Sequence, residues 1–155
     1  MNPFMKEALL LAEKSLETED VPIGAVIVKD GEIIGRGYNQ KEGKKDPTAH
    51  GEMIAIREAA KHLGHWWLED CEMYVTLEPC AMCGGAIVNS RIGHLYIGAR
   101  NKRFGACGSS LDVVNGPSSN HHVAITYGLM EEECVTMLET FFRALRKKKK
   151  EEKDL

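Results

Sequence analysis

The chain has 155 residues, of which 43% are apolar and 28% charged, and its formal net charge is −3. This composition fits one globular domain and excludes collagen-like, low-complexity and broadly disordered chains. No apolar run approaches the ~20 residues that a bilayer span needs, and the run over residues 8–12 is too short for a signal-peptide core. We therefore expect no membrane partner and a cytoplasmic location.

The first half of the chain predicts a helix, a hairpin and a second helix. Apolar residues at helical spacing mark the first helix over residues 5–16. Two β-rich runs, residues 23–29 and 32–38, are separated by an Asp-Gly pair, which is a strong hairpin signal. Thr48 is expected to cap the second helix, which carries one apolar face and ends at Gly64.

The second half continues the alternation of strands and helices. Residues 72–77 predict a buried strand, and Pro79 is expected at the first position of a small-residue helix. The other expected elements are strands over residues 94–98 and 123–127, a long loop 99–122 between them, and a last helix over 131–146. The last helix should bury an apolar stripe that ends with Phe141, Phe142 and Leu145. This alternation favours an α/β layered domain with a central sheet.

Charge is unevenly distributed along the chain. From Arg143 onward there are seven basic and three acidic residues, so the other 142 residues carry a balance of −7. Such an acidic body is unlike that of a general nucleic-acid binder. We divide the chain into one domain, residues 1–146, and a charged C-terminal tail, residues 147–155. The four consecutive lysines of the tail are either simply solvated or attracted to a phosphate backbone.

Two short clusters carry the chemistry: His50-x-Glu52 and Pro79-Cys80-x-x-Cys83. A Cys-x-x-Cys pair at the start of a helix places both sulfurs within one turn, where the helix N-terminus favours the metal-binding thiolate. With the His50 imidazole they make three ligands suited to Zn²⁺, and three rather than four leave a coordination position for water. The sequence thus predicts a catalytic zinc site.

Glu52 follows His50 by two residues, so the two side chains diverge and the carboxylate is free to act as general acid and base. A thioredoxin-like redox pair is one alternative, but it leaves the His-x-Glu cluster unexplained. A structural zinc would need a fourth ligand, and Cys71, Cys107 and Cys134 lack the close spacing of a zinc finger. The odd cysteine count also argues against a disulfide framework. The order H-x-E…P-C-x-x-C matches the established signature of zinc-dependent base deaminases.

Further motifs extend this match over nearly the whole chain up to Arg146. They include DVPIGAV (residues 20–26), GYN (37–39), DPTAH (46–50), YVTLEPCAMC (74–83), SRI (90–92) and FFR (141–143). On these motifs the chain resembles the zinc-dependent cytidine/deoxycytidylate deaminase superfamily and, within it, the bacterial tRNA-specific adenosine deaminases. The resemblance implies a three-layer α/β/α sandwich with a central mixed sheet, assembled as a homodimer with one Zn²⁺ per subunit.

The implied reaction converts adenosine to inosine at the wobble position of a tRNA anticodon. Zinc hydroxide would attack C6, and Glu52 would protonate the ring nitrogen and then the leaving amine. Asn39 would hydrogen-bond the flipped-out base, although the residues alone also allow it to cap the end of the hairpin strand. Contacts to the anticodon arm are implied for the long loop, by Asn101, Lys102, Arg103 and Phe104, and for the last helix, by Phe142, Arg143 and Arg146. The alternative is that Phe142 belongs partly to the core and Arg143 lies on a solvated face.

Two positions depart from the family pattern. Gly51 stands where the family usually has alanine, at a cost of ~1 kcal/mol or less in a helix. Asn101 stands where many bacterial members carry aspartate, and a neutral amide accepts fewer hydrogen bonds than a carboxylate. The second departure bears on selectivity for ribose over deoxyribose.

Two other functions fit the same ligands. A deaminase of free guanine, cytosine or deoxycytidylate would share the zinc ligands and the glutamate. A non-catalytic RNA-binding subunit with a structural zinc would lack the glutamate, as such eukaryotic relatives do, so Glu52 argues for activity.

Overall fold

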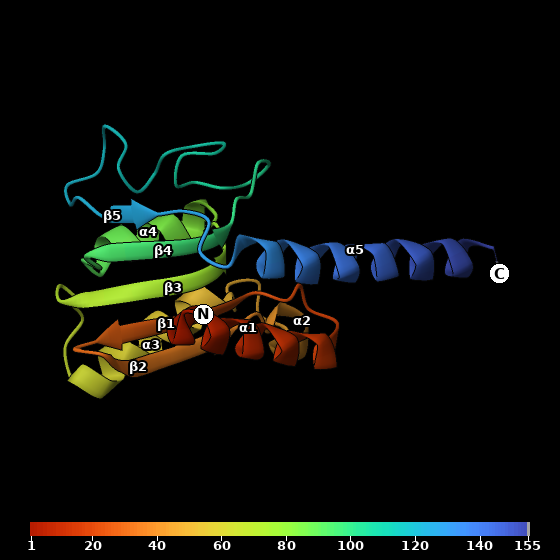
Figure 1. The fold of residues 1–155 in the computed structure, drawn as a ribbon, viewed down its shortest axis with the longest axis horizontal. Coiled ribbons are helices and arrows are strands. Elements are labelled where there is room, and N and C mark those ends of the chain that lie inside the picture. The colour runs from red at the N-terminus through yellow and green to blue at the C-terminus, as the bar shows by residue number, and fades with distance from the viewer. Residues whose placement is uncertain (155) are drawn as a thin grey trace.

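A five-stranded mixed sheet forms the centre of the structure, a computed structural model that describes residues 1–154 (Figure 1). The strands are β1 (Gly24–Lys29), β2 (Glu32–Tyr38), β3 (Cys71–Leu77), β4 (His94–Ala99) and β5 (Ala124–Thr126). Their spatial order is β2-β1-β3-β4-β5. β1 pairs antiparallel with β2 and β3, whereas β3, β4 and β5 run parallel to one another.

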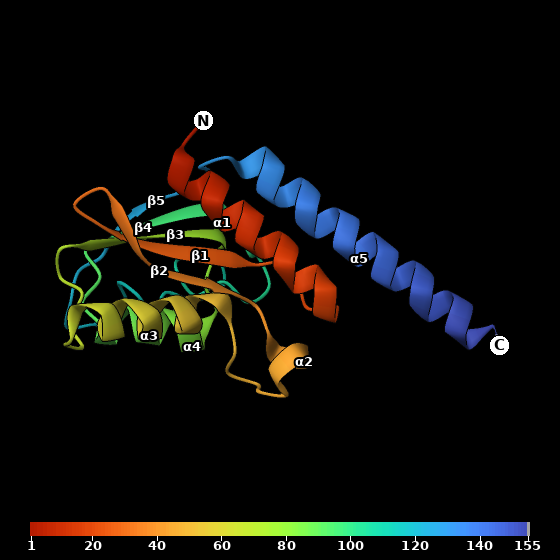
Figure 2. The ribbon, with the colours of Figure 1, turned by 90° about the horizontal axis from the view of Figure 1, so that it is seen from below.

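Helices cover both faces of this sheet. They are α1 (Pro3–Lys14), α2 (Lys41–Lys44), α3 (Gly51–Leu63), α4 (Ala81–Asn89) and α5 (Glu131–Lys153), with a 3₁₀ turn over Ser15–Thr18. α1 and α5 lie on one face, and α3 and α4 lie on the other (Figure 2). The predicted three-layer α/β/α sandwich with a central mixed sheet is therefore confirmed.

The sequence of β1 shows why the sheet is buried on both faces. Ala25 and Ile27 belong to the core beneath α3 and α4, whereas Val26 and Val28 belong to the core beneath α1 and α5. Successive side chains of a strand point to opposite faces, so a continuous apolar run suits a strand that is covered on both sides.

The hairpin forms where the Asp-Gly pair predicts it. Asp30 has φ 50° and Gly31 has φ 77°, the two positive angles that a tight two-residue hairpin turn requires. Further along the chain, α3 ends at Gly64, which adopts φ 78° as a helix-terminating glycine.

Helix α3 lies unusually close to β2, because small residues face each other across the contact. A Cβ atom built on Gly37 would lie 2.7 Å from the backbone nitrogen of Ala55, so no larger residue fits there without a shift. This close approach positions the start of α3, and with it His50, beside the end of β2.

Two predicted helix starts are wrong. Thr48 does not cap α3, since its backbone N–H and its hydroxyl both donate to Asp46 Oδ1, at 2.8 Å and 2.7 Å. The helix begins instead after His50, and no side chain at that position makes a cap hydrogen bond. Pro79 likewise lies outside α4, whose N-cap is Cys80. In both helices the residue at the N-cap is a predicted metal ligand.

The last helix is longer and less buried than its apolar pattern predicts. α5 continues through Lys153, so the charged segment 147–153 is helical, and it projects beyond the sheet (Figure 1). Only Cys134 and Leu138 of its apolar residues are buried, whereas Phe142 is 39% exposed. The neighbouring elements are too short to cover the whole stripe.

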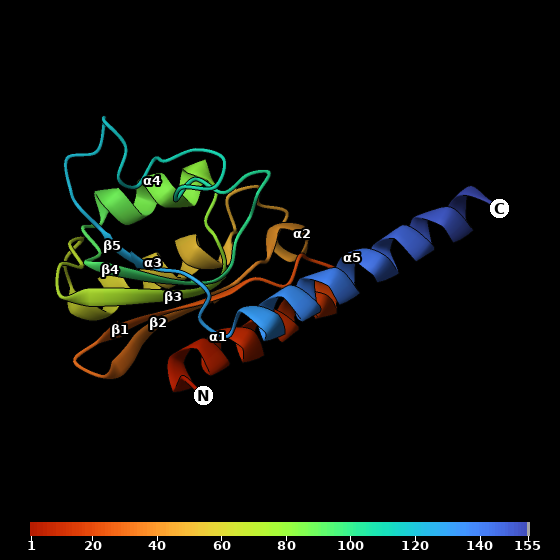
Figure 3. The same cartoon turned by 45° about the horizontal axis from the view of Figure 1, so that its top comes forward.

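The segment 100–123, which joins β4 to β5, folds over the α4 side of the sheet (Figure 3). Its backbone is tied to the start of α4, because Ala106 N–H donates to the Pro79 carbonyl at 2.9 Å. Within residues 1–154, no helix combines the length and the apolarity needed to cross a bilayer.

Candidate functional site

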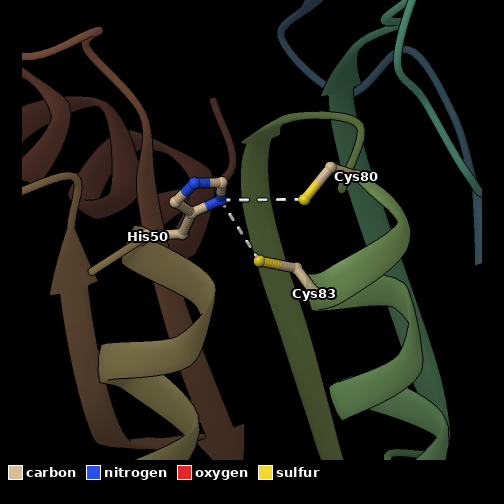
Figure 4. Close-up of side chains that lie close together, drawn as sticks. All are labelled: His50, Cys80 and Cys83. Carbon is tan, nitrogen blue, oxygen red and sulfur yellow. Dashed lines mark hydrogen bonds between the residues drawn. The ribbon is translucent and has the colours of Figure 1, made fainter. Parts of the chain in front are cut away.

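The predicted ligands meet where the N-termini of α3 and α4 converge. His50 precedes α3, Cys80 precedes α4, and Cys83 lies in the first turn of α4 (Figure 4). His50 Nδ1 lies 3.7 Å from Cys80 Sγ and 3.5 Å from Cys83 Sγ. Tetrahedral zinc with ordinary Zn–N and Zn–S bond lengths would require an N···S distance of about 3.6 Å. The three donor atoms therefore fit a zinc ion.

This cluster is distinctive within the chain. Among residues 1–154, it is the only group of three His, Cys, Asp or Glu side chains whose ligand atoms lie within 4.8 Å of one another. All five cysteines are free, and Cys71, Cys107 and Cys134 do not join the cluster. The described residues thus offer three protein ligands and no fourth one from these cysteines.

The cluster also stabilises negative charge on sulfur. Hydrogen bonds with Cys83 and His50 lower the pKa of the Cys80 thiol to about 3. The same contact with Cys80 raises the pKa of His50 and of the Cys83 thiol. A thiolate beside an imidazole is the form of these groups that binds a soft or borderline cation.

Glu52 lies in the first turn of α3 with only 3% of its surface exposed. Burial raises the pKa of its carboxyl group to about 7. Within residues 1–154, Glu52 Oε1 has no hydrogen-bond partner. An unpaired buried oxygen is costly unless another molecule completes its hydrogen bonds. A carboxyl group with a pKa near neutrality beside a metal site is suited to general acid–base chemistry.

A cavity of about 770 Å³ opens above these groups, at the carboxyl ends of β3 and β4. This is where ligands bind in open parallel sheets. The wall includes His50, Glu52 and Cys80, whereas Cys83 is fully buried beneath. Six of the predicted substrate-binding residues also line it: Asn39, Asn101, Lys102, Arg103, Phe104 and Phe142.

Arg143 and Arg146 do not line this cavity. They line an adjoining groove of about 550 Å³ on α5, and Phe142 and Arg100 border both hollows. Phe104, at 62% exposed, and Phe142 lie at the mouth with their rings accessible. Phe142 belongs to neither core cluster, so the predicted core role of Phe142 is wrong.

Both predicted asparagines use their side-chain oxygen within the protein. Asn39 Oδ1 accepts a hydrogen bond from Gly51 N–H at 2.8 Å, so Asn39 satisfies one of the free N–H groups at the start of α3. Asn101 Oδ1 accepts from Phe104 N–H at 3.1 Å and closes a local turn. Each asparagine therefore retains its side-chain NH₂ group to donate hydrogen bonds to a ligand.

Sequence reasoning missed several wall residues. Asp20, Lys41, Glu78 and Arg100 also line the cavity. Asp20 is buried and accepts hydrogen bonds from the Glu42 and Gly43 N–H groups, at 2.8 Å and 3.3 Å. The available signal was a charged residue directly after a buried strand, which describes Glu78 and Arg100.

Comparisons with known proteins find similarity to deaminases. Residues 2–146 match the model of the MafB19-like deaminase family. The chain is 48% identical over 152 residues to a tRNA-specific adenosine deaminase of Streptococcus pyogenes serotype M3, covering 98% of this chain and 89% of that relative. It is also 48% identical over 147 residues to the tRNA-specific adenosine deaminase of Bacillus subtilis, covering 95% and 92% of the two chains.

A solved structure is similar as well. It comes from work on A-to-I editing by tRNA:A34 deaminases at the wobble position, and it superposes with a TM-score of 0.84 at 41% identity. The match covers 87% of this chain and 98% of that one. The same α/β fold therefore occurs in a protein studied for wobble-position editing.

Proposed function

This chain belongs to the family of tRNA-specific adenosine deaminases, and from that membership we propose that it converts adenosine to inosine at the wobble position of a tRNA anticodon. One observation carries the proposal. The carboxyl group of Glu52 is buried, and its Oε1 has no hydrogen-bond partner among the described residues, in the wall of a cavity beside a set of three metal ligands.

We propose that His50, Cys80 and Cys83 hold one zinc ion per chain. The N···S distances and the nitrogen and sulfur donors support zinc over the harder cations, which prefer oxygen. When bound, zinc supplies a Lewis acid that makes water acidic enough to ionise near neutral pH.

The protein's own groups then move protons and orient the base. Glu52 accepts one proton from water and delivers it to the ring nitrogen N1 of adenine, while the hydroxide that remains adds to C6. Glu52 then takes the proton of the new C6 hydroxyl and delivers it to the amino group, so that the C6–N bond breaks and ammonia leaves. A carboxyl group with a pKa of about 7 can both accept and donate at neutral pH. Asn39 is held by Gly51, so its NH₂ group is the donor left for an acceptor atom of the base.

The rim of the cavity supports an anticodon arm as the substrate. Phe104 and Phe142 offer exposed rings on which bases can stack, and Lys102 and Arg103 offer cations for phosphate. Arg143 and Arg146 extend this basic rim along the adjoining groove. We further propose a cytoplasmic location and, by family resemblance, a homodimer.

The decisive experiment compares substrates. An anticodon stem-loop with adenosine at the wobble position should release ammonia, and sequencing of the product should read inosine at that position only. A matched stem-loop with guanosine there should release none. Release of ammonia from free guanine or cytidine, with none from the stem-loop, would instead establish a small-molecule deaminase.

A further inference from the structure

Glu78 is a buried carboxylate that the proposed reaction does not use. It directly follows β3, and only 1% of its surface is exposed. The ion pairs within residues 1–154 join Arg36 to Glu7 and Lys148 to Glu19, so none of them neutralises Glu78. A buried carboxylate without a cation needs strong hydrogen bonds to offset the loss of water.

Those hydrogen bonds all come from the loop over residues 101–109. Oε2 accepts from Cys107 N–H at 3.0 Å and from Ser109 N–H at 3.1 Å. Oε1 accepts from Asn101 N–H at 3.3 Å and from the Ser109 hydroxyl. Hydrogen bonds to an ionised carboxylate are roughly twice as strong as neutral ones. One side chain therefore binds both ends of the loop.

The middle of the loop also packs directly on this carboxylate. A Cβ atom built on Gly105 would lie 2.6 Å from Glu78 Oε2, so only glycine lets the loop approach this closely. Between the two anchored ends, Lys102, Arg103 and Phe104 line the mouth of the cavity. These are residues through which the anticodon arm would be held.

We propose that Glu78 is a positioning residue that fixes the 101–109 loop as the RNA-facing wall of the cavity. The proposal rests on the proposed function, because it assigns the loop to substrate binding. Glu78 acts through the loop, whereas His50, Cys80, Cys83 and Glu52 carry the chemistry. Loosening the loop should therefore weaken binding of the stem-loop and leave the chemical step largely intact.

The test is Glu78→Gln in the zinc-loaded enzyme. Glutamine has the same length, but it puts an NH₂ group where one carboxylate oxygen accepts hydrogen bonds. The NH₂ donor would then oppose the N–H or O–H donors of the loop. We expect KM for the anticodon stem-loop to rise at least tenfold while kcat changes less than threefold. Hydrogen exchange at the Cys107 and Ser109 amides should accelerate, and exchange within α4 and the zinc content should stay unchanged.

Two further variants approach the same contact from the loop. Gly105→Ala places a Cβ atom against both the Asn101 carbonyl oxygen and the Glu78 carboxylate, so the loop must shift away from the carboxylate. We expect the same rise in KM and the same faster exchange. Ser109→Ala removes the hydroxyl that donates to Glu78 and accepts from Arg100 at 3.5 Å, but it keeps the backbone hydrogen bonds to the carboxylate. It should give a smaller effect in the same direction, even if Glu78→Gln folds poorly. Gly85→Ala is the matched control, because a Cβ atom there meets nothing within 4 Å.

The outcomes distinguish failure of the inference about Glu78 from failure of the proposed function. Lost zinc, or a lower kcat with unchanged KM, would mean that Glu78 acts through the adjacent Cys80, and the inference would be overturned. Unchanged exchange in the loop would overturn it as well. If the unmodified enzyme leaves the stem-loop intact, the proposed function fails, and the exchange measurement still decides whether Glu78 holds the loop.

Discussion

Glu52 and His50 lie two residues apart at the start of α3, and their different surroundings suit them to different roles. The His50 ring nitrogen meets two sulfur atoms, whereas Glu52 Oε1 has no partner within residues 1–154. A fully paired carboxylate would contribute more to stability but would have no free oxygen for a proton. The proposed reaction therefore explains why the protein buries an oxygen of Glu52 without a hydrogen-bond partner, at a cost in stability.

Replacing Glu52 with alanine should separate activity from stability. We expect kcat to fall at least 10²-fold, as is typical for loss of a general acid–base group. The free energy of unfolding should stay the same or rise, because the variant removes an unpaired buried group. Single-turnover kinetics and thermal unfolding of the zinc-loaded protein measure both. Deamination at the normal rate would refute the proposed proton transfer.

Replacing Cys83 with alanine should remove the metal. Two protein ligands remain in that variant, and a site with an incomplete ligand set binds zinc far more weakly. Elemental analysis after dialysis should find less than 0.1 zinc per chain. Cys134→Ala is the matched control, since Cys134 is equally buried on α5 but lies outside the cluster. Full zinc in Cys83→Ala would contradict the ligand set.

At the scale of elements, the site depends on how closely the helices approach the sheet. Gly35 and Gly37 of β2 leave room for Ala55 of α3, which brings the N-terminus of α3 next to that of α4. The end of α5, in contrast, packs against little of the domain. From residue 144 to residue 154 only Leu145 is partly covered, and both side chains of the Lys148–Glu19 pair are exposed. This segment therefore contributes little to the packed domain.

Ending the chain at Arg146 tests the predicted division into domain and tail. We expect the free energy of unfolding to fall by no more than about 1 kcal/mol, because only an exposed ion pair is lost. Four consecutive helical lysines point around the whole helix, so one or two can face RNA. The salt dependence of stem-loop binding should then become shallower by roughly 0.7 per lost contact.

The outcome of this truncation is read by thermal unfolding and by binding titrations at several salt concentrations. Replacing Lys147 to Lys150 with glutamine in the full-length chain is the control, since it removes the charges and keeps the helix. Unfolding of the truncated protein at ambient temperature would show that the domain extends beyond Arg146.

On the scale of the whole molecule, the cavity is assembled from distant parts of the chain. Asn39 follows β2, the ligands come from α3 and α4, the loop after β4 supplies Phe104, and Phe142 arrives from α5. The sheet holds these parts in fixed positions because β1, β3 and β4 are buried along most of their length. Because the body of the protein is acidic, the proposed recognition of RNA depends on a local basic and aromatic rim.

We also predict, from the family resemblance, that two copies of the chain form a homodimer. Light scattering coupled to size exclusion should give twice the 17.2 kDa of one chain, at all concentrations used for assays. A mass of 17.2 kDa at micromolar concentration would contradict the homodimer.

The sequence by itself determined the features that depend on local spacing. The hairpin, the helical periods and the Cys-x-x-Cys pair each involve residues a few positions apart, where backbone geometry alone dictates the outcome. The pattern of proposed ligands and the glutamate proposed as general acid and base could therefore be recognised before any fold was known.

Only the tertiary structure decided which polar groups satisfy one another across the chain. In the first turn of α3, Gly51 N–H donates a hydrogen bond to the side chain of Asn39, twelve residues earlier, rather than to that of Thr48. Glu78 is satisfied by Cys107 and Ser109, 29 and 31 residues later. No local pattern encodes such partners, because a buried donor or acceptor is paired by whatever the packed sheet and loops bring within reach.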